Sequence, residues 1–363
     1  MSTPQQQQII HFKLDKAQLI QAFPPKFMNK NKNFLYSLHH QEDHEDGYEG
    51  ELSYSRYRAL QRPKLFNKVA MNQCQVIVSP DIFQYNEKVK EDEEENNIGS
   101  SSSSSSSSTT TTTKHWYVNF ADARLFVAWT GSLFAQDEIQ VAEHPILASL
   151  ALYLAKMSRD DTKYTPVTVQ SMPTPVLIQN VDRRVAVDVT NFPIYGNNFA
   201  RASEDVIRKA STVMDIKTTR KSNILAIAAP SGGYGEYKMS EILNIFDTAY
   251  TGFKACKDES SQAGCSVTVV HTGHWGCGAF GGNRELMAIL QILAARVAQV
   301  DYLFYHAFNK DGVTAVQNAQ KYLDQLLGTQ ELDPNNESNS VPLNDIFMQI
   351  VEKRYFWGFS DGN

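Results

Sequence analysis

The chain has 363 residues, of which 42% are hydrophobic, and a formal net charge of −6. This length allows one large domain or two ordinary ones with a substantial buried core. The acidic balance leaves no electrostatic footprint for nucleic acid or an anionic membrane, which argues against a general binder of polyanions. The four cysteines have no metal-like spacing, and we expect no metal, no cofactor and no membrane or sequence-specific nucleic-acid partner.

The N-terminal part of the chain predicts an accessory region of helical and mixed structure over residues 1–87. Residues 15–23 (DKAQLIQAF) indicate a short helix, and residues 50–60 and 74–79 are strand-like or mixed. An acidic and Ser/Thr-rich segment follows over residues 88–113. Its composition buries too little apolar surface to offset the entropy of ordering, so we expect a disordered insertion.

From residue 114 to residue 330 apolar strands alternate with helical patterns, which predicts an α/β domain with helices on the faces of a sheet. The expected strands are VLIQN (176–180), RVAVDVT (184–190), NILAIAA (223–229), SVTVVH (266–271) and DYLFYHAF (301–308). The expected helices are 143–156, 237–253 and 284–298. Residues 331–363 are expected to form a C-terminal tail.

A glycine-rich loop separates the strand at 266–271 from the helix at 284–298. Residues 273–282 read GHWGCGAFGG, with five glycines and two aromatic residues. Bare backbone N–H groups at the start of a helix can bind phosphate, and the aromatic rings provide flat surface for a nucleotide. The alternative is a strand-to-helix turn that needs positive φ and binds nothing.

The second chemical candidate is Gln136-Asp137-Glu138 at the start of a helical pattern (FAQDEIQVAEHPI). Adjacent carboxylates at this position usually reflect the preference of a helix N-terminus for negative charge. Their context makes them more informative, because a strand and a loop precede them at a fixed spacing.

Together, TGHWGCGAFGG and WYVNFADARLFVAWTGSLFAQDEIQ resemble the glycine-rich loop and the signature region of the poly(ADP-ribose) glycohydrolases. The resemblance implies a macrodomain-like mixed sheet flanked by helices. It also implies a glycosidase that hydrolyses the ribose–ribose O-glycosidic bonds of poly(ADP-ribose), acting on the polymer or on ADP-ribosylated proteins. Such a protein is expected inside the cell, in the nucleus or the cytoplasm, in the DNA damage response.

The resemblance assigns Glu138 as the residue that gives and takes the proton, supported by Asp137. It implies that the glycine loop holds the diphosphate and that other residues line the substrate. These residues are Asn119, Asp122, Gln136, Phe199, His274, Trp275, Gly276, Cys277, Gly278, Ala279 and Phe280, with adenine contacts at Ile82 and Phe83.

Several positions depart from the family's pattern. Phe126-Val127-Ala128 stands in place of a triple glycine. Asn119 stands in place of an aspartate, Asp122 in place of an asparagine, and Asp137 in place of a glutamate. Three hypotheses therefore stay open: a divergent enzyme that uses Glu138, a weak or inactive module that binds ADP-ribose, and a scaffold that has lost the ligand.

Overall fold

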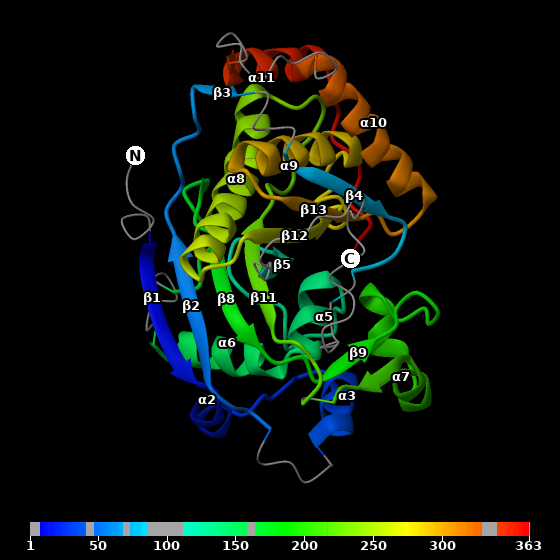
Figure 1. The fold of residues 1–363 in the computed structure, drawn as a ribbon. Coiled ribbons are helices and arrows are strands. Elements are labelled where there is room, and N and C mark those ends of the chain that lie inside the picture. Colours follow the sequence, from blue (N-terminus) through cyan, green and yellow to red (C-terminus); the bar gives the residue numbers. More distant parts are fainter. Residues whose placement is uncertain are drawn as a thin grey trace, which may run out of the picture.

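The computed structural model describes residues 8–40, 47–67, 73–83, 85, 112–157, 164–215, 217–328 and 340–362. One mixed sheet forms the centre of the molecule (Figure 1). Its strands follow the order β1 (Gln8–Asp15), β2 (Glu51–Tyr57), β8 (Val176–Val181), β11 (Ser222–Ala228), β5 (Thr113–Ala121), β12 (Val267–Gly273), β13 (Tyr302–His306), β4 (Gln75–Ser79).

The direction of the strands changes across this sheet. β11, β5, β12, β13 and β4 run parallel to their neighbours, whereas β1, β2 and β8 pair in antiparallel fashion up to β11. Parallel strands place their carboxyl ends at one edge of the sheet, where α/β proteins bind ligands. The loops that follow β5, β11, β12 and β13 therefore share one edge.

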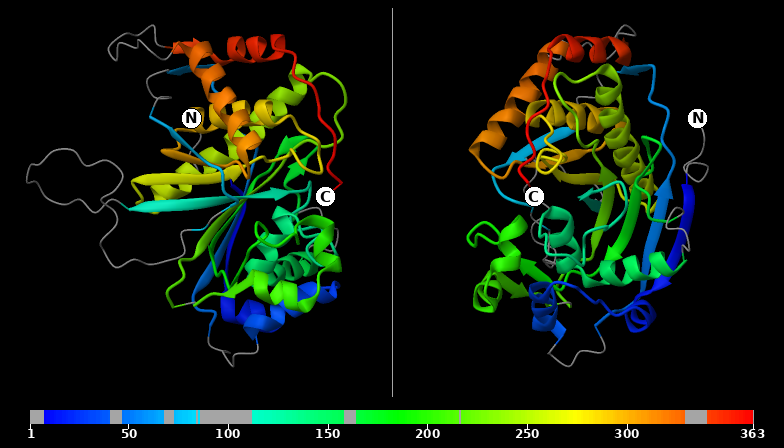
Figure 2. Two further views of the ribbon diagram at one scale, coloured as in Figure 1. Left: turned by 90° about the vertical axis from the view of Figure 1, so that its right-hand side faces the viewer. Right: turned by 180° about the vertical axis from the view of Figure 1, so that it is seen from behind.

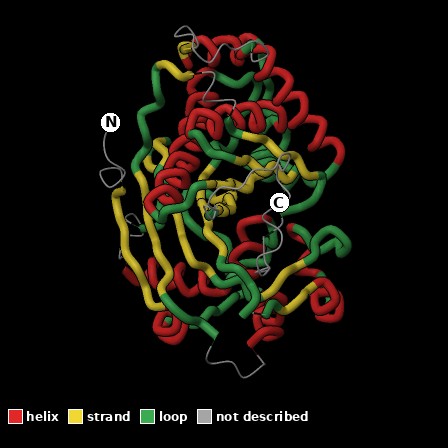
Figure 3. Tube along the Cα trace, viewed as in Figure 1, coloured by secondary structure: helices red, strands yellow, loops and turns green. Residues whose placement is uncertain are grey.

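Helices cover both faces of the sheet, as the red tubes show in Figure 3. One face carries α8 (Met239–Gln262), α9 (Arg284–Ala298), α10 (Lys310–Leu327) and α11 (Leu343–Glu352). The other carries α2 (Lys16–Ala22), α3 (Lys30–His40), α5 (Gln136–Glu143) and α6 (Pro145–Met157). Successive residues of β5 face opposite layers: Trp116 and Val118 belong to the first core, and Tyr117 to the second.

Smaller elements complete the fold. A lobe beside α3 and α5 contains β9 (Val185–Val187), η1 (Gly196–Arg201), α7 (Glu204–Ala210) and β10 (Ser211–Val213). Two further pairs are β3 (Leu65–Asn67) with β14 (Ser340–Pro342), and β6 (Thr168–Val169) with β7 (Met172–Pro173).

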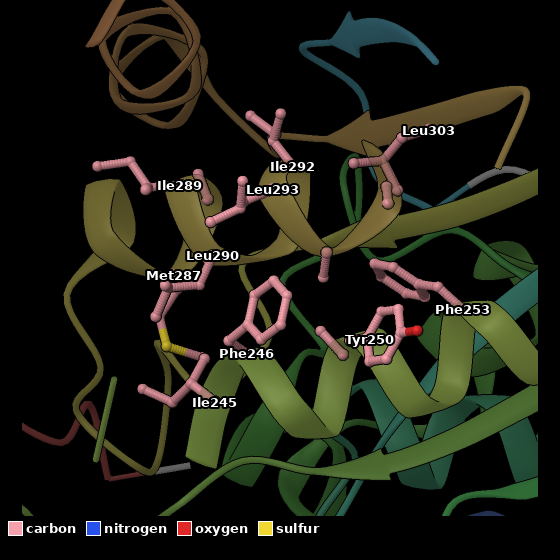
Figure 4. Close-up of a cluster of buried hydrophobic side chains, with 14 of the residues drawn as sticks. Ile245, Phe246, Tyr250, Phe253, Met287, Ile289, Leu290, Ile292, Leu293 and Leu303 are labelled. Atoms are coloured by element: carbon pink, nitrogen blue, oxygen red, sulfur yellow. The ribbon is translucent and has the colours of Figure 1, made fainter. Parts of the chain in front are cut away.

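The larger core lies between α8, α9 and the sheet (Figure 4). The helix expected over residues 284–298 is confirmed as α9, and its residues Leu286, Ile289, Leu290 and Leu293 are fully buried. Their spacing places them on one face of the helix, where Phe246 of α8 meets them. The predicted α/β architecture, a mixed sheet with helices on both faces, is confirmed.

The domain boundaries drawn from the sequence need correction at both ends. The region before residue 87 is no separate accessory layer, because β1, β2 and β4 are strands of the central sheet. Alternation in β1 explains this, since Ile10, Phe12 and Leu14 pack on the second core. Residues 340–362 are no loose tail, because α11 buries Ile346 and Phe347 in the larger core. The expected insertion at 88–113 lies outside the described residues, apart from its last two, and β5 begins at Thr113.

Candidate functional site

Two of the shared-edge loops lie side by side. β5 and β12 are parallel neighbours, and both loops leave their carboxyl ends. A Cβ on Gly273 would lie 3.4 Å from the Phe120 ring, so the two strand ends are in close contact. The Phe120 N–H donates to Gln136 Oε1 at 2.8 Å, and Gln136 is the first residue of α5. The glycine loop and the carboxylates of α5 are therefore held at the same edge.

Two buried carboxylates begin α5. Glu138 is 4% exposed and Asp137 is 7% exposed. The Glu138 Oε2 accepts the Ala135 N–H at 3.0 Å, which fixes the side chain back over the helix start. Asn119 donates to Asp137 Oδ1 at 2.8 Å. Burial and the neighbouring Glu138 carboxylate raise the pKa of Asp137 to about 7. The pair therefore resists carrying two negative charges at neutral pH.

A buried lysine supplies positive charge beneath this pair. Lys32 lies on α3, is fully buried, and donates from Nζ to the Trp129 carbonyl at 2.9 Å. Burial lowers the pKa of Lys32 to about 8, and the charges of Glu138 and Asp137 oppose that lowering. Sequence reasoning missed Lys32 because it is more than a hundred residues from the carboxylates. Only the packing of α3 against α5 brings them together.

The glycine loop carries unpaired main-chain donors. Within the described residues, the N–H groups of Gly276, Gly278, Ala279 and Phe280 donate to no protein acceptor. Gly276 has φ +75°, and a Cβ there would lie 2.6 Å from the Ala229 Cβ. The alternative of a plain turn thus explains part of the sequence, because glycine is needed for packing as well. The free amides are what an anion requires.

The side chains of this loop point into the protein. Trp275 is buried and donates from Nε1 to the Ile227 carbonyl at 3.1 Å. The His274 ring lies against Tyr305, with 3.4 Å between His274 Nδ1 and the tyrosine hydroxyl. The Cys277 Sγ contacts the Trp275 carbonyl at 3.6 Å. Of the expected contacts in this loop, the main chain, the exposed Ala279 and the half-buried Phe280 remain available to a ligand.

A known family model matches a part of the chain that includes the glycine loop but not residues 136–138. Residues 176–315 match the family model "Poly (ADP-ribose) glycohydrolase (PARG), Macro domain fold". The chain is 25% identical over 250 residues to the probable poly(ADP-ribose) glycohydrolase 2 of Arabidopsis thaliana, which covers 60% of this chain and 41% of that protein. It is 46% identical over 57 residues to poly(ADP-ribose) glycohydrolase 1 of the same plant, covering 16% of this chain and 9% of that protein.

Over residues 176–315 the chain is similar to the poly(ADP-ribose) glycohydrolases. It spans about two fifths of the length of the first of these curated relatives. Among solved structures, the glycohydrolase of Thermomonospora curvata bound to the inhibitor ADP-HPD has a TM-score of 0.41 at 12% identity, covering 79% of this chain and 98% of that one. The glycohydrolase of Deinococcus radiodurans in complex with ADP-ribose has a TM-score of 0.40 at 11% identity, covering 72% and 94%.

The loop expected to stand in place of the family's triple glycine has a backbone conformation typical of glycine. Phe126 has φ 55°, a left-handed conformation that non-glycine residues rarely adopt. Its ring is buried in the second core, whereas Val127 is 58% exposed and Ala128 is half-buried. Phe126 therefore fills the protein interior and not the edge of the sheet.

Two further expected substrate contacts have structural roles in this relative of the glycohydrolases. Both polar atoms of the Gln136 side chain bond to the backbone of β5. Its Oε1 accepts the Phe120 N–H, and its Nε2 donates to the Val118 carbonyl at 2.9 Å. The Asn119 side chain is fully buried and holds Asp137, while its own Oδ1 has no hydrogen-bond partner among the described residues. Asp122, by contrast, is exposed at the loop after β5 and accepts the Ala123 N–H.

Phe199, the aromatic residue predicted to contact the substrate, does not face a ligand site. Phe199 is fully buried and stacks on Phe134, with ring centroids 3.8 Å apart. It cannot contact a ligand in this structure. Tyr195 is half-buried instead, and burial raises its pKa to about 12, with the nearby Asp361 charge as the next cause. A backbone hydrogen bond from Gln136 places the Tyr195 hydroxyl at the start of α5.

The residues expected near adenine lie at the same sheet edge, after β4. Ile82 and Phe83 are half-buried. The Phe83 ring is 5.0 Å from the His306 ring and 6.3 Å from the Phe120 ring, centroid to centroid. Phe83 thus belongs to an aromatic group that spans β4, β13 and β5. Its role in binding adenine stays a prediction.

In the ranges that the structure describes, no three or more His, Cys, Asp or Glu side chains gather in a way that could hold a metal ion. Over those same ranges, no helix has the length and apolar character needed to cross a membrane.

Proposed function

We propose that this protein hydrolyses the ribose–ribose O-glycosidic bonds of poly(ADP-ribose) and releases ADP-ribose. The observation that carries the proposal is the pairing of two features at one sheet edge. Glu138 begins a helix after β5, and the unpaired amides of the glycine loop follow β12, its parallel neighbour. A buried acid beside an anion site matches what cleavage next to a diphosphate needs.

Glycoside hydrolysis needs a proton for the departing oxygen and an activated water. In the proposed reaction the Glu138 carboxylic acid gives its proton to the leaving ribose oxygen as the anomeric carbon–oxygen bond breaks. The resulting carboxylate then takes a proton from the water that adds to the anomeric carbon, which restores the acid. Since Oε2 accepts the Ala135 N–H, Oε1 is the oxygen available for this proton.

The neighbours of Glu138 support it in different ways. Asp137 resists ionisation and so limits the negative charge beside a diphosphate. Lys32 balances the charge that Glu138 carries after it has given up its proton. Tyr195 is the aromatic side chain we assign to the substrate in place of Phe199, because it is accessible and lies by α5.

The decisive experiment compares Glu138→Gln with the parent for release of ADP-ribose from polymer and for affinity towards ADP-ribose. Glutamine can still accept the Ala135 N–H but cannot transfer a proton, so we expect release to fall at least about 10²-fold with affinity unchanged. Glu204→Gln is the matched control, because Glu204 also lies in the first turn of a helix but is exposed. Equal rates in Glu138→Gln and the parent would refute the role of Glu138.

A second candidate function is an ADP-ribose-binding module without catalysis. The side chains of the Phe126–Ala128 loop and the charge of Asp122 favour it, since they replace main chain and add negative charge near the expected diphosphate. The same assay separates the two functions. Binding of ADP-ribose with no release from polymer by the parent would establish the module.

The biological setting follows from the proposed activity. Its partners would be poly(ADP-ribose) or ADP-ribosylated proteins, in the nucleus or the cytoplasm, during the DNA damage response. Recovery of ADP-ribosylated proteins by the Glu138→Gln variant, and their loss in competition with free ADP-ribose, is the corresponding test.

A further inference from the structure

The segment after α11, Tyr355–Gly362, crosses the same sheet edge (Figure 2). It begins on the loop that follows β11. The Tyr237 N–H donates to the Tyr355 carbonyl at 2.9 Å, and the Trp357 N–H donates to the Gly235 carbonyl at 2.8 Å. The Trp357 ring stacks on Tyr237, with centroids 4.2 Å apart. Gly233 lies so close beneath this ring that a Cβ there would be 1.8 Å from it. The start of the segment is therefore firmly anchored.

Its second half, Gly358–Gly362, lies on the glycine loop. The Gly358 N–H donates to the Gly281 carbonyl at 2.8 Å. A Cβ on Gly281 would meet the Gly358 carbonyl and the Ser360 nitrogen at 3.2 Å. A Cβ on Gly278 would lie 3.1 Å from Asp361 Oδ2. The Asp361 carboxylate thus lies directly over the loop whose amides are unpaired.

The segment ends on the other side of the site. The Gly362 carbonyl accepts from Asn197 Nδ2 at 2.9 Å, and Asn197 belongs to η1. The Asp361 charge also acts on Tyr195, which contacts the start of α5. Residues 358–362 therefore connect the glycine loop to the lobe that contains η1. They occupy the space that a bound diphosphate and ribose would need.

We propose that Gly358–Gly362 is a built-in competitor that must leave the glycine loop before a diphosphate can bind there. A carboxylate and a phosphate carry the same sign of charge and favour the same donors. Asp361 therefore both fills the space of the ligand and repels it. The inference deepens the proposed function and rests on its assignment of the diphosphate to the glycine loop.

The anchoring differs along the segment, and this makes displacement feasible. Tyr355 and Trp357 are buried, whereas residues 358–362 are exposed. The N–H of Asp361 is 3.5 Å from the Gly278 carbonyl, at the outer limit of a hydrogen bond. Trp357 can stay in place while the residues after it swing away.

The test measures the dissociation constant of ADP for the full chain, the Asp361→Asn variant and an Asp345→Asn control. ADP carries the diphosphate without the terminal ribose, so its binding does not depend on hydrolysis. Asp345 is an exposed aspartate in the first turn of α11, outside both the glycine loop and residues 355–362. We expect ADP to bind about tenfold more tightly to Asp361→Asn, since a like charge within a few ångströms of the ligand is removed. The control should match the parent.

A second measurement follows the segment itself by amide hydrogen exchange in the parent. Saturating ADP should speed exchange at Gly358, because its hydrogen bond to Gly281 breaks when the segment leaves. Unchanged or weaker ADP binding in Asp361→Asn, no ADP binding to either protein, or slower exchange at Gly358 with ADP would each overturn the inference. Tighter ADP binding in Asp361→Asn with no ADP-ribose release from polymer by any variant would refute the proposed activity and leave the competitor in place.

Discussion

The loops after β5 and β12 both need a residue with positive φ, and they accommodate it in opposite ways. Both leave neighbouring parallel strands, lead into a helix and turn with positive φ. The loop after β12 uses Gly276 and Gly281, with φ of 75° and 68°, and leaves amides free at the edge. The loop after β5 turns at Phe126, with φ 55°, and anchors itself by burying the ring.

The difference shows how a loop without glycine can still make a left-handed turn. A non-glycine residue in the left-handed region costs about 1 kcal/mol or more. Burying a phenylalanine side chain contributes about 2–3 kcal/mol, which offsets that strain. The turn at Phe126 therefore persists, but its side chain now ties the loop to the core. We infer that the loop after β12 keeps the capacity to bind an anion and that the loop after β5 has exchanged this capacity for stability.

The largest expected effect tests the packing of Phe126. Phe126→Ala should lower the free energy of unfolding by about 4 kcal/mol, because it leaves a cavity in the second core and keeps the strained φ. Val127→Ala is the control, since that side chain is exposed, and it should change stability by less than about 0.5 kcal/mol. Urea unfolding measures both. Equal losses in the two variants would mean that Phe126 does not anchor the loop.

The next effect tests the glycine loop. Gly276→Ala places a Cβ 2.6 Å from the Ala229 Cβ at φ +75°, whereas Gly264→Ala places one in open space at φ +77°. Both substitutions carry the cost of the left-handed backbone, about 1 kcal/mol. Only the first also overpacks, so we expect about 3 kcal/mol for Gly276→Ala. Similar melting temperatures for the two variants would show that the close approach of the loop is not needed.

Local patterns were enough to predict much of this fold. Alternating strands and apolar helices predicted the sheet and its covering layers, and the motifs at 136–138 and 273–282 follow two neighbouring strands of that sheet. These signals depend on neighbours in sequence, such as the stripe that includes Leu286 and Leu290 on α9. Wherever contacts are local, the pattern and the structure agree.

The rest depends on contacts between distant segments. Lys32 reaches the carboxylates only because α3 packs on α5, and nothing in its own neighbourhood marks it. Phe199 is buried because it stacks on Phe134, which is 65 residues earlier in the chain. Residues 355–362 carry no motif, yet their backbone follows two loops far away in the sequence. A single sequence holds no signal for such long-range pairing.

The smallest expected effect concerns the carboxylate pair and its pH dependence. The folded-state pKa of Asp137 is about 7, above its ordinary value of 3.8. A carboxyl group whose pKa is raised on folding stabilises the native state below its unfolded pKa, and this contribution is lost as the pH rises through the folded pKa. Each pH unit between the two values is worth about 1.4 kcal/mol. The parent should therefore lose about 2 kcal/mol of stability between pH 5 and pH 7 through this group.

Asp137→Asn removes this titration and keeps an acceptor for Asn119. We expect its free energy of unfolding to fall less than that of the parent over the same pH range. Above pH 8 the variant should be the more stable protein, because in the parent the buried Asp137 carboxylate is then charged and lies beside Glu138. Asp345→Asn, which alters an exposed carboxylate, should follow the parent at every pH. Parallel curves for Asp137→Asn and the parent from pH 5 to pH 8 would mean that Asp137 is ionised throughout. The buried pair would then be stabilised by Lys32 and not by a retained proton, and Asp137 would add a negative charge at the start of α5 at neutral pH.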